Sequence, residues 1–250
     1  MTTIEEYSPS TYGDRIAGNY DETHASLFDA EHVAPTVDLL AGLALGGRAL
    51  ELGIGTGRIA LPLAAKGVPI QGIDASEAMV AMLRAKEGGG DIQVSISDFS
   101  EFELDTEFSL IFVVFNTFFA LLTQDAQVRC FQSAADHLGE DGVFVIEAFV
   151  PDLSRFVHGQ SVAATLVETD RASLDASRHD AVSQLVTGQH VYLSEGGIRM
   201  YPVRLRYAWP SELDLMARLA GLRLRHRWSD WRRSHFTATS TGHVSVYEKE

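Results

Sequence analysis

The sequence has little of what marks secreted or membrane-spanning proteins. Cys130 is its one cysteine, so no disulfide can form within the chain, and we expect a reducing compartment, the cytoplasm. Residues 1–10 are polar and lack the apolar core of a signal peptide. The longest apolar run, residues 110–122, is interrupted by Asn116 and Thr117 and falls short of the roughly 20 residues that a membrane helix needs. We therefore expect no membrane partner.

Positive charge is also scarce. The formal net charge is −14, from 20 Lys and Arg residues against 34 Asp and Glu residues, so we expect no nucleic-acid partner. Arginines cluster between Arg199 and Arg233. They form either a positive entrance for an anionic substrate or solvated faces of strands, and the alternation in residues 222–227 favours the second interpretation. With 46% hydrophobic residues, the 250-residue chain can fold as one large domain or as one domain that carries an insertion.

A loop rich in glycine follows the first apolar strand, at about residues 48–53. Gly53, Gly55 and Gly57 stand at alternate positions before a helical pattern. Glycine permits a tight turn and a close approach by a ligand, and the amides that begin the next helix point at that ligand. Arg58 stands where the dinucleotide fingerprint needs a glycine, which weakens a nicotinamide or flavin interpretation, and no Gly-Lys-Ser/Thr follows to make a P-loop.

Asp74 ends a second apolar strand, at about residues 68–74. In a βαβ unit an acid at this strand tip can accept hydrogen bonds from ribose hydroxyls, and it would repel a 2′-phosphate. The two strands and the glycine loop together predict a nucleoside-binding α/β domain.

Three motifs in order resemble the successive motifs of class I S-adenosylmethionine-dependent methyltransferases: residues 51–57, 72–79 and 97–99. The resemblance covers about the whole chain in element order. It implies a Rossmann-like α/β fold, with a seven-stranded, mostly parallel sheet between helices on both faces, and S-adenosyl-L-methionine as cofactor. It also implies the cofactor contacts, which are Tyr20, Glu51, Gly53, Gly55, Gly57, Asp74, Ala75, Met79, Asp98, Phe99 and Phe115.

The resemblance is strongest to small-molecule methyltransferases with a β-strand lid, which include aminosugar N-methyltransferases of antibiotic pathways. It implies a methyltransferase domain at residues 1–150 and 210–250 and an antiparallel lid inserted after the fifth strand, at residues 151–209. Some of those enzymes carry a histidine base after the fourth strand, where this chain has Phe119-Ala120-Leu121. This departure puts sugar N-methylation in doubt, and Phe115, Phe118 and Phe119 suggest an apolar or aromatic acceptor instead.

The catalytic candidates are Asn116, Glu147 and His190, and we assign no metal site. Asn116 could orient an acceptor by hydrogen bonding, whereas Glu147, within an apolar strand, is either a substrate contact or a structural hydrogen-bond acceptor. His190 is a candidate base because histidine side chains in general titrate in the range that a general base needs. Three further candidates for a base lie in the lid or in late loops, namely Tyr192, Tyr201 and His235.

We therefore expect a cytoplasmic methyltransferase that acts on a small molecule of secondary metabolism. Methyl transfer from a sulfonium requires mainly alignment, so the sequence specifies the cofactor better than the acceptor. The alternatives are a cyclase or isomerase that uses the sulfonium charge without transfer, a non-catalytic binding protein, and a nicotinamide-binding protein. The oligomeric state stays open, and a homodimer is one of the arrangements.

Overall fold

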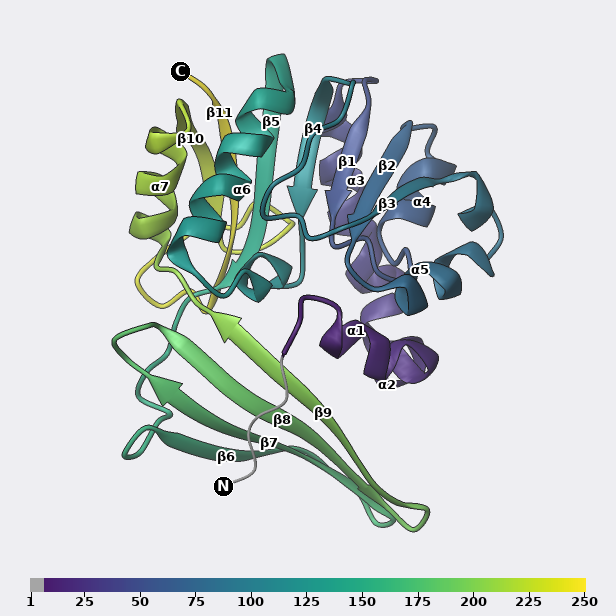
Figure 1. Cartoon of the computed structure of the whole chain (residues 1–250), viewed down its shortest axis with the longest axis vertical. Coiled ribbons are helices and arrows are strands. Elements are labelled where there is room, and N and C mark those ends of the chain that lie inside the picture. The colour runs from purple at the N-terminus through teal and green to yellow at the C-terminus, as the bar shows by residue number, and fades with distance from the viewer. Residues whose placement is uncertain (1–6) are drawn as a thin grey trace.

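The computed structural model describes residues 7–250, and residues 1–6 of the polar N-terminal stretch lie outside this range. Its centre is a seven-stranded sheet in the order β10-β11-β5-β4-β1-β2-β3 (Figure 1). The strands are β1 (Ala49–Leu52), β2 (Ile70–Asp74), β3 (Gln93–Ile96), β4 (Phe108–Val113), β5 (Leu138–Phe149), β10 (Leu222–Trp228) and β11 (Gly242–Lys249). Strands β1 to β5 run parallel, and β10 and β11 close the sheet antiparallel. The mostly parallel sheet implied by the resemblance is confirmed.

Helices cover both faces of this sheet. One face packs against α6 (Gln124–His137) and α7 (Pro210–Leu219), through Phe131 and Leu213 among others. The other face packs against α3 (Ala30–Ala44), α4 (Ala60–Ala65) and α5 (Glu77–Arg84). Strands β1 and β4 carry apolar residues at almost every position because both of their faces are buried.

Local signals in the sequence fix where these helices begin. The Ser76 hydroxyl accepts a hydrogen bond from the Met79 amide at 3.2 Å and caps α5, a position that favours serine. Thr123 caps α6 in the same way, through the Ala126 amide at 3.1 Å. Pro210 stands in the first turn of α7, where its missing N–H costs nothing. The caps orient α5 so that Met79 faces the ends of the central strands.

A four-stranded antiparallel sheet, in the order β6-β7-β8-β9, follows β5 and forms the lid (Figure 1). Its strands are β6 (Gln160–Val167), β7 (Arg171–Asp180), β8 (Leu185–Ser194) and β9 (Gly197–Arg206). The sequence predicts the lid, but it misses β7. The apolar pattern at residues 181–186 predicts a strand, whereas the structure has the β7–β8 turn at residues 181–184 and begins β8 at Leu185. Polar and small residues dominate β7, so the apolar alternation that signals a strand is weak there.

Two short helices, α1 (Thr11–Ile16) and α2 (Tyr20–Thr23), lie between the central domain and the lid (Figure 1). Ile16 and Ala17 pack against Met79 of α5 and Tyr201 of β9. Short 3₁₀ turns complete the described chain, at Ala17–Asn19, Ala25–Phe28, Gly89–Asp91 and Thr117–Ala120. The N-terminal segment therefore joins the two sheets and covers the space between them.

Between residues 7 and 250, no helix is long and apolar enough to cross a membrane. The same residues hold no cluster of His, Cys, Asp and Glu side chains that could bind a metal ion.

Candidate active site

A cavity of about 690 Å³ lies between the carboxyl ends of β1, β2 and β4, the N-terminal helices and the lid. Ligands of open α/β sheets bind at this edge, beyond the carboxyl ends of the strands. The residues that line it come from both sheets, so the cavity has a wall on the central domain and a wall on the lid. Most of the residues predicted to contact the cofactor line the first wall: Tyr20, Glu51, Gly53, Gly55, Asp74, Ala75, Met79, Asp98, Phe99 and Phe115.

The glycine loop serves two different purposes. Gly53 and Gly55 have φ angles of 73° and 55° and line the cavity, where a side chain at Gly53 would meet the Thr117 methyl group at 2.5 Å. Gly57 also has a positive φ, 82°, but it is absent from the described cavity wall. A Cβ there would come within 2.3 Å of a Leu83 methyl group, so Gly57 allows the loop to pack on α5.

Asp74 lies at the tip of β2 and supports the loop. Its two carboxylate oxygens accept hydrogen bonds from the Gly55 amide at 2.7 Å and from the Ser76 amide at 2.8 Å. Burial raises the pKa of Asp74, and the Ser76 and Gly55 amides oppose this effect. Each oxygen keeps acceptor capacity toward the cavity, because an ionised carboxylate has about four lone-pair sites.

Glu51 is a buried acid at the end of β1, with 2% of its surface exposed. One carboxylate oxygen, Oε2, is buried and has no hydrogen-bond partner among residues 7–250. Burial raises the pKa of Glu51 to about 8, although Arg58 favours the charged form. A buried, unsatisfied acid on the cavity wall fits a ligand that brings a cationic group to it.

A strained turn connects β4 to the cavity floor. Phe115 and Asn116 both have left-handed backbone conformations, with φ of 56° and 64°, which costs on the order of 1–3 kcal/mol for each residue. Glu147 holds this turn, since its Oε2 accepts from the Phe115 amide at 2.7 Å and its Oε1 accepts from the Trp231 indole at 2.8 Å. The Asn116 side-chain oxygen accepts from the Phe149 amide at 2.7 Å.

These contacts separate the two candidates on the turn. Asn116 lines the cavity, while Glu147 is absent from the described wall because both of its oxygens are directed to protein N–H groups. Of the two roles that the sequence leaves open for Glu147, the geometry favours the structural acceptor. Phe115 is in turn flanked by the Arg58 guanidinium, 5.1 Å from the ring centroid, and by His24.

The N-terminal helices close the cofactor side of the cavity through partly buried polar contacts. Asp21 accepts a hydrogen bond from the Thr56 hydroxyl at 2.6 Å and pairs with Lys86 at 2.5 Å. Asp14 accepts from the Ser76 hydroxyl at 2.6 Å. Tyr20, whose pKa burial raises, lies over His24 with ring centroids 4.5 Å apart.

The other wall of the cavity is formed by the inner face of the lid. Pairing places Asp175 opposite His190 and His190 opposite Tyr201, so one side chain from each of β7, β8 and β9 shares a face. The same face carries Ser177, Gly188 and Val203, which follow in register. An apolar floor completes this half, made by Leu121, Leu122, Ala126 and Phe149.

Two expectations about this half are corrected. Phe118 and Phe119 are fully buried and pack against Phe131 and Phe149, so of the three phenylalanines that suggest an aromatic acceptor only Phe115 lines the cavity. Of the candidate bases, His190 lines the cavity, whereas Tyr192 and Tyr201 pack in the apolar cluster around Ile16. His235 forms a backbone bridge with Trp228 at the end of β10 and is not among the described residues that line the cavity.

The sequence gives no hint of Asp175, which lies on the one lid strand that it misses. In Ser173-Leu174-Asp175-Ala176-Ser177, a two-residue period is present, but its inward positions are polar. Only the pairing with β8 reveals which side of β7 faces the cavity.

Comparisons with known proteins identify the family. A family model described as a methyltransferase domain matches residues 49–142. The CcbJ methyltransferase from Streptomyces caelestis is 40% identical, and the two structures match with a TM-score of 0.91 over 97% of this chain and 99% of that one. The chain belongs to the S-adenosylmethionine-dependent methyltransferases. The family, the cofactor and the enzyme class predicted from the sequence are therefore confirmed.

Two further relatives extend the comparison. The cypemycin N-terminal methyltransferase of a Streptomyces species is 26% identical over 241 residues, which are 92% of this chain and 98% of that protein. The amino pentose methyltransferase CalS10 of Micromonospora echinaspora, in a structure with bound S-adenosylmethionine, has a TM-score of 0.71 at 21% identity, over 92% of this chain and 96% of that one. The second likeness concerns the fold, including the lid.

Proposed function

We propose that this methyltransferase transfers the methyl group of S-adenosylmethionine to a nitrogen atom of a small molecule of secondary metabolism. The observation that carries the proposal is the two-walled cavity, in which the lid wall carries polar residues and the central wall carries the glycine loop proposed to bind the cofactor. The relative that is named for N-terminal methylation supports nitrogen as the acceptor atom. Residues 151–209 would then serve as the subdomain that covers the acceptor.

The residues on the first wall fit the cofactor. Asp74 would hold the ribose hydroxyls, and the acceptor capacity left on its oxygens supports this role. Glu51, with its unsatisfied oxygen, would accept the cationic methionine end beside Tyr20. Asp98 would accept a hydrogen bond from the adenine amino group, and the Phe99 amide would donate one to the adenine ring. Met79 would pack against the face of that ring. The main chain at Gly53, Gly55 and Phe115 would complete the contacts.

When bound, S-adenosylmethionine supplies an electrophilic methyl group on a positively charged sulfur. The protein therefore has to align the acceptor nitrogen with this group and to exclude water. The strained turn at Phe115 and Asn116 lies between the two halves of the cavity, and Glu147 fixes its position. The lid and the N-terminal helices restrict solvent from the other side.

A panel of acceptors tests the proposed reaction. The enzyme is incubated with S-adenosylmethionine and a peptide with a free N-terminus, an aminodeoxysugar, or the matched alcohols in which oxygen replaces nitrogen. We expect S-adenosylhomocysteine to form with at least one amine and not with its alcohol. Turnover only with the alcohols would contradict nitrogen methylation.

The raised pKa of Glu51 predicts proton release when the cofactor binds. At pH 7 the carboxyl group of the free enzyme is mostly protonated, because burial raises its pKa to about 8. A cation bound beside it favours the carboxylate, so the affinity should increase as the pH rises toward 8 and change little above that. Calorimetry at pH 7 in two buffers of different ionisation enthalpy measures the number of protons released when the cofactor binds.

The control for this prediction is Glu51→Gln, which keeps the shape of the side chain and cannot ionise. It should bind the cofactor more weakly and release no proton. The same shift makes the stability of the free protein depend on pH. The stabilisation that comes from burying Glu51 in its protonated form is fully present below pH 4.5, the ordinary pKa of the side chain, and is lost as the pH rises toward 8. Equal binding heats in both buffers for the wild type would contradict this assignment.

Two finer expectations remain proposals. We propose a homodimer that forms through β6, an edge strand of the lid. This strand has no charged residue and exposes Val162 and Val167. The other edge of the lid, β9, packs beside α1. Sedimentation analysis of the intact chain measures this state. A cytoplasmic location agrees with the fully buried, free thiol of Cys130.

A further inference from the structure

Two side chains of the lid form a carboxylate–imidazole pair inside the cavity. The Nδ1 atom of His190 lies 2.5 Å from a carboxylate oxygen of Asp175, and both residues line the cavity. They stand directly opposite each other on β8 and β7. Because Asp175 accepts from Nδ1, the neutral ring carries its proton there, and the lone pair that remains is on Nε2.

The pair lies close to the side of the cavity where the methionine end of the cofactor is proposed to bind. The Tyr12 ring of α1 meets the His190 ring edge to face, with centroids 6.2 Å apart. His24, whose pKa is lowered by burial, packs against Phe115 with ring centroids 5.9 Å apart. His190 therefore lies on the lid wall of the same cavity that Phe115 lines from the central domain, with the N-terminal segment packed beside it.

Three tyrosines flank the imidazole, one from each of α1, β8 and β9. Tyr201 lies opposite it on β9, Tyr192 follows it on β8, and Tyr12 faces it from α1. Burial raises the pKa of Tyr12 and of Tyr192 and lowers that of His24. Asp175 is thus the charged group that contacts the ring, and its effect is to orient the ring and to stabilise an imidazolium if one forms.

We propose that His190 accepts the proton that the attacking nitrogen loses, with Asp175 as the residue that positions it. This inference rests on the proposed nitrogen methylation. An amine binds as its ammonium ion, and the N–H bond breaks with its electron pair left on nitrogen while the proton moves to Nε2 of His190. The nitrogen lone pair then forms the bond to the methyl carbon, and the carbon–sulfur electrons stay on sulfur to give neutral S-adenosylhomocysteine.

In this arrangement the lid histidine takes the place of the histidine base that some similar enzymes carry after β4. The corresponding segment is Phe119-Ala120-Leu121, in which Phe119 is buried in the core and no side chain can accept a proton. A base on the lid reaches the same cavity from the opposite wall. The proton is finally released to solvent as the imidazolium loses it, which regenerates the neutral ring.

The test compares rates of His190→Gln and Asp175→Asn with the wild type between pH 6 and pH 9.5, using the amine from the panel that the wild type methylates. Without the base, only the amine that is already deprotonated in solution reacts, so the rate of His190→Gln should rise about tenfold for each pH unit below the pKa of that amine. We expect a loss in kcat/KM of roughly 100-fold at pH 7 that nearly disappears at pH 9.5.

Asp175→Asn keeps the size of the side chain but can hold the wrong tautomer of His190, and we expect a smaller loss of about tenfold at pH 7. Both variants should bind S-adenosylmethionine as the wild type does in calorimetry. The matched controls are His32→Gln on the exposed side of α3 and Asp170→Asn in the exposed β6–β7 turn, which should keep wild-type rates.

The outcomes separate the inference from the function on which it rests. A loss in His190→Gln that has the same size at every pH, or no loss at all, would overturn the role of His190 while nitrogen methylation stands. A wild-type protein that binds the cofactor and methylates no amine would overturn the proposed function itself, and the inference with it.

Discussion

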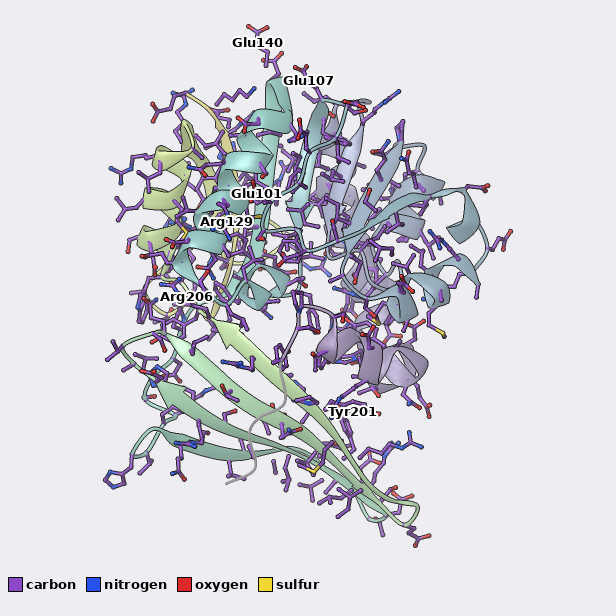
Figure 2. The ribbon with its side chains drawn as sticks, viewed as in Figure 1. Glu101, Glu107, Arg129, Glu140, Tyr201 and Arg206 are labelled. Carbon is purple, nitrogen blue, oxygen red and sulfur yellow. The ribbon has the colours of Figure 1, made fainter. Side chains whose placement is uncertain are left out.

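Replacing Arg206 with alanine should lower the free energy of unfolding by about 3–5 kcal/mol, the effect of removing one partner of a buried ion pair. Arg206 ends β9 where the lid meets the central domain (Figure 2). Its guanidinium, 6% exposed as a residue, donates to Glu212 of α7 at 2.8 Å and to Gln127 of α6 at 2.6 Å. The substitution leaves the Glu212 carboxylate without its cation in a partly buried site.

The network around Arg206 explains why the loss should be large. Gln184, in the β7–β8 turn, accepts from Arg206 at 3.2 Å and donates to Glu212 at 2.9 Å, and Gln127 donates to the Arg206 carbonyl at 2.8 Å. Burial alone would raise the pKa of Glu212, but the hydrogen bonds from Gln184, Arg206 and Gln124 hold it below its usual value. These contacts join the end of β9 and the β7–β8 turn of the lid to two helices of the central domain, α6 and α7.

Urea denaturation of three proteins tests this account. Arg223 pairs with Glu248 on the surface, with its side chain 63% exposed, so Arg223→Ala should cost less than about 1 kcal/mol. The double variant Arg206→Met, Glu212→Met removes both charges and should recover much of the stability that Arg206→Ala loses. Equal stability of Arg206→Ala and Arg223→Ala would show that the buried network does not hold the lid in place.

Asp74→Ala should weaken binding of S-adenosylmethionine by at least 100-fold. Hydrogen bonds to a charged group contribute about 1.5–3 kcal/mol each, and two ribose hydroxyls are proposed to bind this carboxylate. The variant also removes the acceptor of the Gly55 and Ser76 amides, which shape the loop. Calorimetry with S-adenosylmethionine and S-adenosylhomocysteine measures the loss, which should be similar for both because they share the ribose.

Two further variants show whether this loss belongs to the ribose site. Asp91→Ala removes an exposed acid before β3 and should bind as the wild type does. Asp74→Asn keeps one side-chain oxygen as acceptor and should lose less affinity than alanine. A folded Asp74→Ala protein with wild-type affinity would show that the ribose hydroxyls do not bind the Asp74 carboxylate.

The central fold could be predicted because its signals are local. Glycines at alternate positions, buried strands with continuous apolar residues, and a serine cap before Met79 each act within a few residues of the chain. Their order along the sequence then specifies a parallel sheet, since crossovers of this kind place the strands side by side. Even so, the sequence could not assign Gly57, whose contact with Leu83 arises from packing.

The acceptor half of the cavity was harder to predict because distant segments form it. Asp175 acquires its role from the pairing of β7 with β8, and Glu147 from contacts with Phe115 and Trp231, which lie far from it in the sequence. Phe119 shows the converse, because residue type alone could not separate a core phenylalanine from one on the cavity wall.

The structure shows the acidic partners of three of the arginines between Arg199 and Arg233. Arg227 is held by Asp214 at 2.6 Å, and Arg223 and Arg225 both pair with Glu248. Two acids of the central domain therefore pair with these three arginines. This agrees with the alternation in residues 222–227 and argues against a positive entrance to the cavity built from these side chains.

The destination of the methyl group tests the central claim most directly. The enzyme is given S-adenosylmethionine with a ¹³C-labelled methyl group and an amine from the panel, and the label is followed by NMR. We predict that the label appears on the acceptor nitrogen, with one S-adenosylhomocysteine formed for each methyl group transferred. Label that stays on the cofactor while the acceptor rearranges would indicate a cyclase or isomerase, and label on oxygen or carbon would contradict nitrogen methylation.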